Sequence, residues 1–139
     1  MTTIEGMRFL GRFLTGDVLE EDELDRARAD GLVLHLRRLR ASVAYDGYRA
    51  PGLRFNGKRQ LTSGGVLITT SRFVLWAGGV RQLDLDRASL PAPSLGVTAD
   101  QEVLEVAFAA EDFHRDRTGR VRVRLWTKEA PHVAEMITR

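Results

Sequence analysis

The chain has 139 residues, of which 43% are hydrophobic and 29% charged, and its formal net charge is +2. These proportions fit one globular domain with a hydrophobic core and argue against a disordered chain. Cysteine is absent, which excludes disulfide bonds and thiolate metal sites, and no apolar run approaches the ~20 residues of a transmembrane helix.

The charge is unevenly distributed along the chain. Residues 1–31 carry a net charge of −4, residues 32–82 of +8, residues 83–113 of −6 and residues 114–139 of +4. If each block stays together in space, the surface is dipolar and suits self-association or docking on a charged partner. If the blocks lie on neighbouring strands, they neutralise one another. The sequence leaves both arrangements open.

Residues 1–31 are expected to form an N-terminal extension that is partly helical. Residues 17–20, Asp-Val-Leu-Glu, have the spacing of a capping box for a helix that ends near Ala29 and is stopped by Gly31. Charged residues interrupt the apolar stretch upstream, so we expect no secretory signal there. That stretch predicts a helix or strand packed on the domain or on a second copy, with a membrane-surface helix as the alternative. Its apolar residues are Ile4, Met7, Phe9, Leu10, Phe13 and Leu14.

Residues 32–45 fit two patterns. Apolar residues alternate in one phase before Arg37 and Arg38 and in the other phase after them, which predicts a strand with a bulge at this pair. A helix is the alternative, with a stripe at Leu32, Leu36, Leu39 and Val43. We favour the strand. Residues 46–59 contain Asp-Gly, Pro-Gly and Asn-Gly pairs and predict a long loop.

Residues 66–68 and 73–76 are apolar runs rich in β-branched and aromatic side chains, joined by the polar turn Thr-Thr-Ser-Arg. They predict a hairpin at the centre of a sheet, buried on at least one side. The next strand alternates Leu83 and Leu85 with Asp84 and Asp86, and two prolines are expected to end or flank it, Pro91 and Pro93.

The last third of the chain predicts two strands and a helix. Apolar side chains alternate over residues 104–110, a turn follows at 116–119, and the next strand alternates apolar with cationic residues. Its inward residues are Val121, Val123 and Leu125, and its outward residues are Arg120, Arg122 and Arg124. Thr127 is placed to cap a C-terminal helix with the stripe Ala130, Val133, Ala134 and Ile137.

This order of elements, several strands and one C-terminal amphipathic helix, resembles the pleckstrin-homology-like (PH-like) superfold. Residues 65–76 are similar to a stretch of GRAM and bacterial PH-like domains, whose marked positions are occupied by Gly65, Leu67, Thr69, Arg72 and Phe73. The resemblance covers about residues 32–139. It implies a mainly-β, bent seven-strand barrel of two packed antiparallel sheets, capped by the terminal helix. It also implies binding of lipid headgroups, peptides or protein subunits, without catalysis.

Candidate binding residues follow from charge and position. In the eukaryotic fold, the lipid site uses basic residues of the first strand, the following loop and the second strand. The corresponding set here is Arg37, Arg38, Arg40, Arg49, Arg54, Lys58 and Arg59. A secondary set, Arg120, Arg122 and Arg124 with Trp126 on the same face, could contact a phosphate backbone. We favour the alternative, in which this row pairs with a neighbouring acidic strand.

The chain carries few signs of an enzyme. His35, His114 and His132 stand in no metal-ligand spacing, and no nucleophile elbow, phosphate loop or dinucleotide fingerprint occurs. Asp84 and Asp86 could hold a cation, but a solvated strand face explains them as well. We therefore expect no catalytic residue, no metal and no cofactor.

Three functions remain. The first is a protein-interaction or self-assembly module, with a protein partner or a homo-oligomer. The second is a peripheral membrane module that binds anionic lipid through the +8 segment. The third, and weakest, is binding of a nucleic-acid backbone. The expected location is the cytoplasm, with the inner face of the membrane as the site of peripheral binding.

Overall fold

The computed structural model describes residues 21–90, 92 and 94–138. Its helices are α2 (Glu21–Ala29) and α3 (Ala130–Thr138), with the short 3-10 turns η1 (Arg87–Ser89) and η2 (Ala110–Asp112). Its strands are β1 (Leu32–Ala50), β2 (Leu53–Phe55), β3 (Lys58–Thr69), β4 (Arg72–Ala77), β5 (Val80–Asp86), β6 (Gly96–Ala99), β7 (Val103–Ala109) and β8 (Thr118–Trp126). The predicted capping box, the apolar N-terminal stretch, Pro91 and Pro93 lie outside the described residues.

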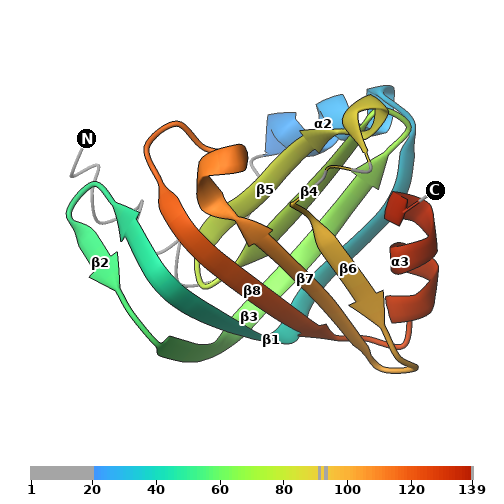
Figure 1. The fold of residues 1–139 in the computed structure, drawn as a ribbon. Helices are drawn as coiled ribbons and strands as arrows, with labels where there is room; N and C mark the ends of the chain where they lie inside the picture. The colour runs from blue at the N-terminus through green and yellow to red at the C-terminus, as the bar shows by residue number, and fades with distance from the viewer. Residues whose placement is uncertain (1–20, 91, 93, 139) are drawn as a thin grey trace.

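These strands form one antiparallel sheet in the order β5-β4-β3-β1-β8-β7-β6, with β2 paired to β1. The sheet curls into a half-barrel (Figure 1). Strands β8, β7 and β6 form the front wall, β3, β4 and β5 form the back wall, and β1 joins the two at the bottom. Helix α3 closes one end, and α2 lies on the outer side of the back wall.

The predicted mainly-β fold with a C-terminal helix and a short N-terminal helix is confirmed. The described residues form eight strands where the sequence predicted seven, because β2 adds a short strand. The two packed layers are the two walls of a single sheet, since β1 is hydrogen-bonded to β3 on one side and to β8 on the other. This architecture is compatible with a PH-like barrel.

Residues 32–45 are a strand with a bulge, as favoured. The ladder between β1 and β3 shifts register between Leu36 and Leu39, and Arg38 lies there with a φ of 55°. The bulge changes which alternate residues face inward, so Leu36 and Leu39 both pack against the core.

The predicted loop at residues 46–59 is wrong, because this segment is a β-hairpin that extends the sheet. Strand β1 continues to Ala50 and pairs with β2, with Tyr48 opposite Phe55. The two aromatic rings stack with their centroids 6.0 Å apart, and Tyr45 packs 5.1 Å from Phe55. This aromatic cluster supports extended strands, so the Pro-Gly pair forms the turn between β1 and β2, and the Asn-Gly pair only interrupts the strand between β2 and β3, which both pair with β1.

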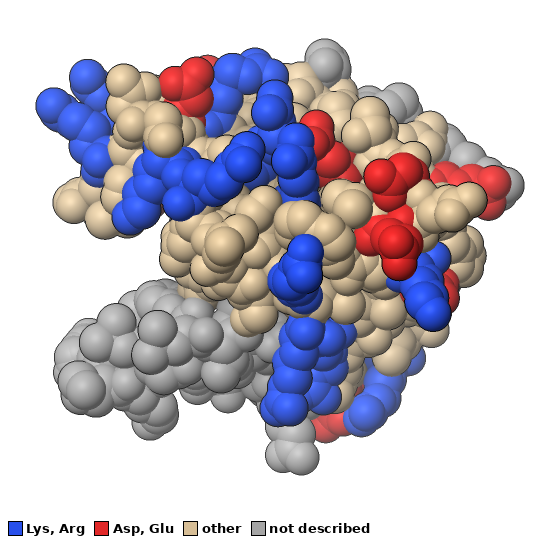
Figure 2. Space-filling view, turned by 90° about the horizontal axis from the view of Figure 1, so that it is seen from below, with Lys and Arg blue, Asp and Glu red and all other residues tan. Residues whose placement is uncertain are grey.

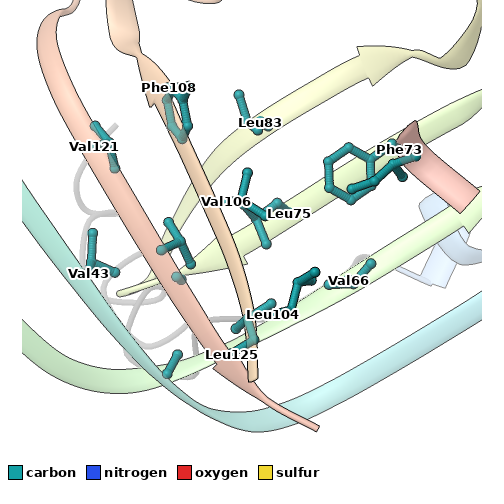
Figure 3. Packing of buried hydrophobic residues seen from close by; sticks show 14 of the residues in the cluster. Val43, Val66, Phe73, Leu75, Leu83, Leu104, Val106, Phe108, Val121 and Leu125 are labelled. Atoms are coloured by element: carbon teal, nitrogen blue, oxygen red, sulfur yellow. The ribbon is translucent and has the colours of Figure 1, made fainter. Parts of the chain in front are cut away.

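The core lies between the two walls. In Figure 3, Val106 of β7 lies beside Leu75 of β4, and Phe108 of β7 lies near Leu83 of β5, all within one buried cluster. Helix α3 covers one end of this core with its buried stripe, Ala130, Val133 and Ile137. The hydroxyl oxygen of Thr127 accepts a hydrogen bond from the Glu129 amide just before the helix, at 3.1 Å. The predicted stripe is thus confirmed, with Ala134 only partly buried, whereas the amide bonded by Thr127 precedes the first residue of α3.

Candidate functional site

The fold brings the two candidate arginine sets onto one face of the sheet. Ala44 of β1 pairs with Arg59 of β3 on one side and with Arg122 of β8 on the other. Directly opposed residues of antiparallel strands project to the same side, so both arginines project outward, away from buried Val43 and Val123. We call this outer surface of β1, β2, β3 and β8 the basic face. Its arginines are Arg40, Arg49, Arg54, Arg59, Arg120, Arg122 and Arg124.

Three residues of the first candidate set lie elsewhere. Arg37 and Arg38 stand at the bulge, beyond the end of the ladder that β1 makes with β8. Lys58 is opposite Tyr45, whose side chain is buried in the core, and its Nζ lies 4.1 Å from the centroid of the Phe55 ring. The sequence could not separate Lys58 from the others, because the phase of the strands through residues 46–59 was not visible in it, whereas Arg37 and Arg38 were already expected to form the bulge.

Part of the basic face is neutralised within the sheet. Glu105 of β7 lies 2.7 Å from Arg124 Nε and 3.7 Å from Arg122 Nε. The guanidinium of Arg40 lies 4.7 Å above the Trp126 ring. The expected pairing with an acidic strand therefore exists for two members of the β8 arginine row, and Arg120 is not one of them.

The other four arginines of the face make no ion pair within the described part of the chain. Among the described residues, no carboxylate lies within ion-pair distance of Arg49, Arg54, Arg59 and Arg120, although Asp46 is opposite Arg120 in the ladder. Figure 2 views the molecule from below and shows lysine and arginine side chains in a broad band over this side, with aspartate and glutamate gathered toward the right.

An exposed leucine stands in the middle of these arginines. Leu61 is 81% exposed. It is opposite Ser42, which in turn is opposite Arg124, and Arg59 is its neighbour two residues back on the same face of β3. The residues of β1 opposite and next to it on one side, Ser42 and Ala44, are small, and the large residue of β1 on this face is Arg40. Leu61 was not among the predicted site residues. It follows shortly after the loop predicted at residues 46–59, so the face of the sheet to which its side chain projects could not be predicted.

The residues that carry the GRAM-like resemblance have a structural role. Thr69 caps the β3–β4 turn by accepting a hydrogen bond from the Arg72 amide at 2.9 Å. The Arg72 guanidinium pairs with Asp84 of β5. Arg81 makes a second ion pair with Asp84, at 3.2 Å. The Asp84 carboxylate, which was considered from the sequence as a possible cation ligand, is therefore bound by two arginines. Asp86 instead accepts from the Ala88 amide at 3.3 Å and begins η1.

The same turn holds the C-terminal end of α2. The Asp30 carboxylate accepts hydrogen bonds from the hydroxyls of Ser71 and Thr69, each at 2.5 Å, and the Thr70 amide donates to the Gly31 carbonyl at 3.0 Å. The hydroxyls of Ser71 and Thr69 lower the pKa of Asp30, because they stabilise its ionised form. Asp30 thus connects α2 to the β3–β4 turn.

This connection is expected to weaken in acid. Since the pKa of Asp30 is lower in the folded than in the unfolded chain, its contribution to stability is complete above about pH 4 and is lost as the pH falls through the folded-state value. Hydrogen exchange should show lower protection of α2 amides in Asp30→Asn at neutral pH. Asp25→Asn, whose carboxylate lies 3.4 Å from exposed Arg28, is the control. Equal loss of protection in both variants would contradict the role of Asp30.

The described residues offer little that resembles a catalytic or metal centre. Within them, no group of three or more His, Asp and Glu side chains is close enough to hold a metal ion. His114 Nε2 lies 2.7 Å from the Gln82 carbonyl oxygen, and burial lowers the pKa of this imidazole. His132 Nδ1 lies 3.4 Å from Glu129 on the surface of α3. No helix in the described part of the chain is long and apolar enough to cross a membrane.

No protein-family model and no curated protein matches this chain.

Proposed function

We propose that this protein is a non-catalytic interaction module of the PH-like superfold, formed by residues 32–139, that docks on an acidic protein surface through its basic face. The single observation that carries the proposal is the arrangement of exposed Leu61 among arginines that come from distant parts of the chain. Residues 1–31 are proposed as its extension. The cytoplasm is the proposed location.

The composition of the face favours a protein partner over a nucleic acid. Protein interfaces combine an apolar anchor at the centre with arginine and aromatic residues around it, and here Leu61 is accompanied by Arg59, Arg124 and the Arg40–Trp126 pair. A phosphate backbone offers no apolar group to contact Leu61. The carboxylate of Glu105 would also repel the phosphates from the β8 arginine row. We therefore keep nucleic-acid binding as the weakest alternative.

Charge also limits the form that self-assembly can take. A symmetric dimer would place the same patch of both copies in contact. Across the basic face, this would oppose arginines to arginines, with only Asp46 and Glu105 among the described residues of the face to compensate. A homo-oligomer would therefore use another surface.

An anionic membrane is the second candidate, and one observation favours it. Leu53 follows the Pro-Gly turn at the tip of the β1–β2 hairpin and is 51% exposed, and Arg54 is next to it. An apolar tip beside basic residues suits shallow insertion between anionic headgroups. This binding would take place at the inner face of the membrane.

Three anionic probes can separate these functions: poly-L-glutamate, vesicles of phosphatidylcholine with phosphatidylserine, and oligothymidylate. The test variant carries Arg49→Gln, Arg54→Gln and Arg59→Gln. The matched control carries Arg28→Gln, Arg115→Gln and Lys128→Gln, which remove as many exposed charges from other surfaces. At physiological salt, we expect poly-L-glutamate binding that weakens at least about tenfold in the test variant and is retained in the control.

The remaining outcomes are equally informative. Leu61→Ala should weaken poly-L-glutamate binding less than the triple arginine variant does, because this polymer has no apolar pocket that could bind the leucine side chain. Vesicle binding that is lost in Leu53→Ser, with no binding of poly-L-glutamate, would replace the protein partner by the membrane. Equal binding by the test and control variants would show that the basic face does not direct docking.

A further inference from the structure

A groove lies between α2 and the outer side of the back wall, beyond the arginines of the basic face and toward the end of β3 at Thr69. Its volume is about 490 Å³, and its lining combines apolar and charged side chains. The apolar part consists of Leu67, Val74 and Trp76 of the sheet with Ala27 of α2, which form a small cluster separate from the main core. The volume falls in the range of about 300–1,000 Å³ that is usual for small-molecule sites.

The mouth of the groove already accommodates a carboxylate. The guanidinium of Arg81 lies 5.3 Å from the centroid of the Trp76 ring. Its Nη2 is 2.7 Å from Glu23 Oε2 of α2, and its Nη1 is 3.2 Å from Asp84 Oδ2. Arg81 is therefore placed over the aromatic floor with one side bound to the sheet and the other side bound to a carboxylate of the helix.

The pair between Arg81 and Glu23 can be exchanged. Both side chains are partly exposed, and ion pairs of this kind contribute little to stability. Asp84 would stay on the opposite edge of the guanidinium, where Arg72 also holds it. A carboxylate that brings its own apolar body into the groove would lie against the parts of Leu67, Val74 and Trp76 that line it, although these side chains are largely buried already.

We propose that this groove binds a small amphipathic monocarboxylate, with its apolar body on Leu67, Val74 and Trp76 and its carboxylate on Arg81 in place of Glu23. In the absence of ligand, Glu23 acts as an internal competitor for the guanidinium. The affinity then depends on two residues in opposite ways, since Arg81 attracts the ligand and Glu23 occupies its position.

The tryptophans provide a reporter for each surface. The chain has two, Trp76 in the groove and Trp126 on the basic face. In Trp126→Phe, fluorescence reports on the groove, and in Trp76→Phe it reports on the basic face. The probe is dodecanoate below its micellar concentration, with 1-dodecanol as the uncharged comparison. We expect a saturable change of Trp76 emission with dodecanoate, a weaker response to 1-dodecanol, and no saturable change from Trp126.

Two substitutions decide the proposal, both made in Trp126→Phe. Arg81→Gln should weaken dodecanoate binding about tenfold, the usual scale for a lost charge-assisted hydrogen bond, and Glu23→Gln should tighten it. Both variants break the same ion pair, so a merely structural effect on α2 would shift the affinity in the same direction in both. Such parallel shifts, equal binding of dodecanoate and 1-dodecanol, or the lack of a saturable Trp76 response would each overturn the proposal.

Discussion

Replacing Gly119 with alanine is expected to lower the free energy of unfolding by about 2–5 kcal/mol. Gly119 has a φ of +105°, and a Cβ atom there would lie 2.4 Å from the Gly47 carbonyl oxygen and 2.6 Å from the Tyr48 Cα. Both contacts are with backbone, so no side chain can rotate away. Urea denaturation followed by tryptophan fluorescence measures the loss.

Gly52→Ala is the matched control for this effect. Gly52 also has a positive φ, of +75°, but no atom lies within 4 Å of the position of its Cβ. Its substitution should cost only the backbone strain, about 1–2 kcal/mol. The difference between the two variants measures the close approach of β8 to β1. If they are equally destabilised, the backbone contact at Gly119 is not tight in solution.

Phe108→Ala is expected to cost about 3–5 kcal/mol, because it opens a cavity between the two walls. Phe108 is fully buried, and Phe113 packs against its edge with the ring centroids 5.7 Å apart. The same denaturation measurement gives the change in unfolding free energy. Leu61→Ala is the contrasting variant, since this leucine is 81% exposed and its loss should change stability by no more than about 0.5 kcal/mol. A large loss of stability in Leu61→Ala would mean that this leucine supports the fold, which would remove it as the proposed anchor.

Local patterns predicted the elements whose signal lies within a few residues. The hairpin at residues 66–76 follows from two continuous apolar runs around a polar turn, and the strand around Val121 and Val123 follows from strict alternation; the structure has both where they were expected. The bulge at Arg37 and Arg38 was also visible, because it changes the phase within one strand. In each case, the evidence lay within a few neighbouring residues.

The hairpin at residues 46–59 could not be predicted in this way. Its glycines and prolines are turn signals in any context, and what decides between a loop and two strands is the packing of Tyr48 on Phe55 and Tyr45. The same limit applies to the candidate site. Arg59 and Arg122 lie on either side of Ala44 because of the register of three strands, which local sequence does not define. The outward position of Leu61 depends on the same register.

The connection made by Asp30 was missed for a related reason. Pairing of the β8 arginines with an acidic strand was expected, but nothing in the local sequence indicated that Glu105 would be the partner of Arg124. Asp30 lies next to the glycine that ends α2, and its hydroxyl partners come almost forty residues later in the chain. Interactions between distant segments carry no local signal.

The position of β8 in the sheet has a consequence for a chain that is still being synthesised. Strands β1 to β5 pair only among themselves along one edge of β1, with β2 and β3 on β1, β4 on β3 and β5 on β4, and can form the back wall as soon as they have left the ribosome. The other edge of β1 must wait for β8, since Ala41 pairs with Leu125. Arg120, Arg122 and Arg124 join the earlier arginines only at that step. A nascent chain therefore presents an incomplete basic face and an open strand edge until β8 has been translated, and a premature stop before β8 would yield a product that tends to aggregate and lacks three of the seven arginines of the face.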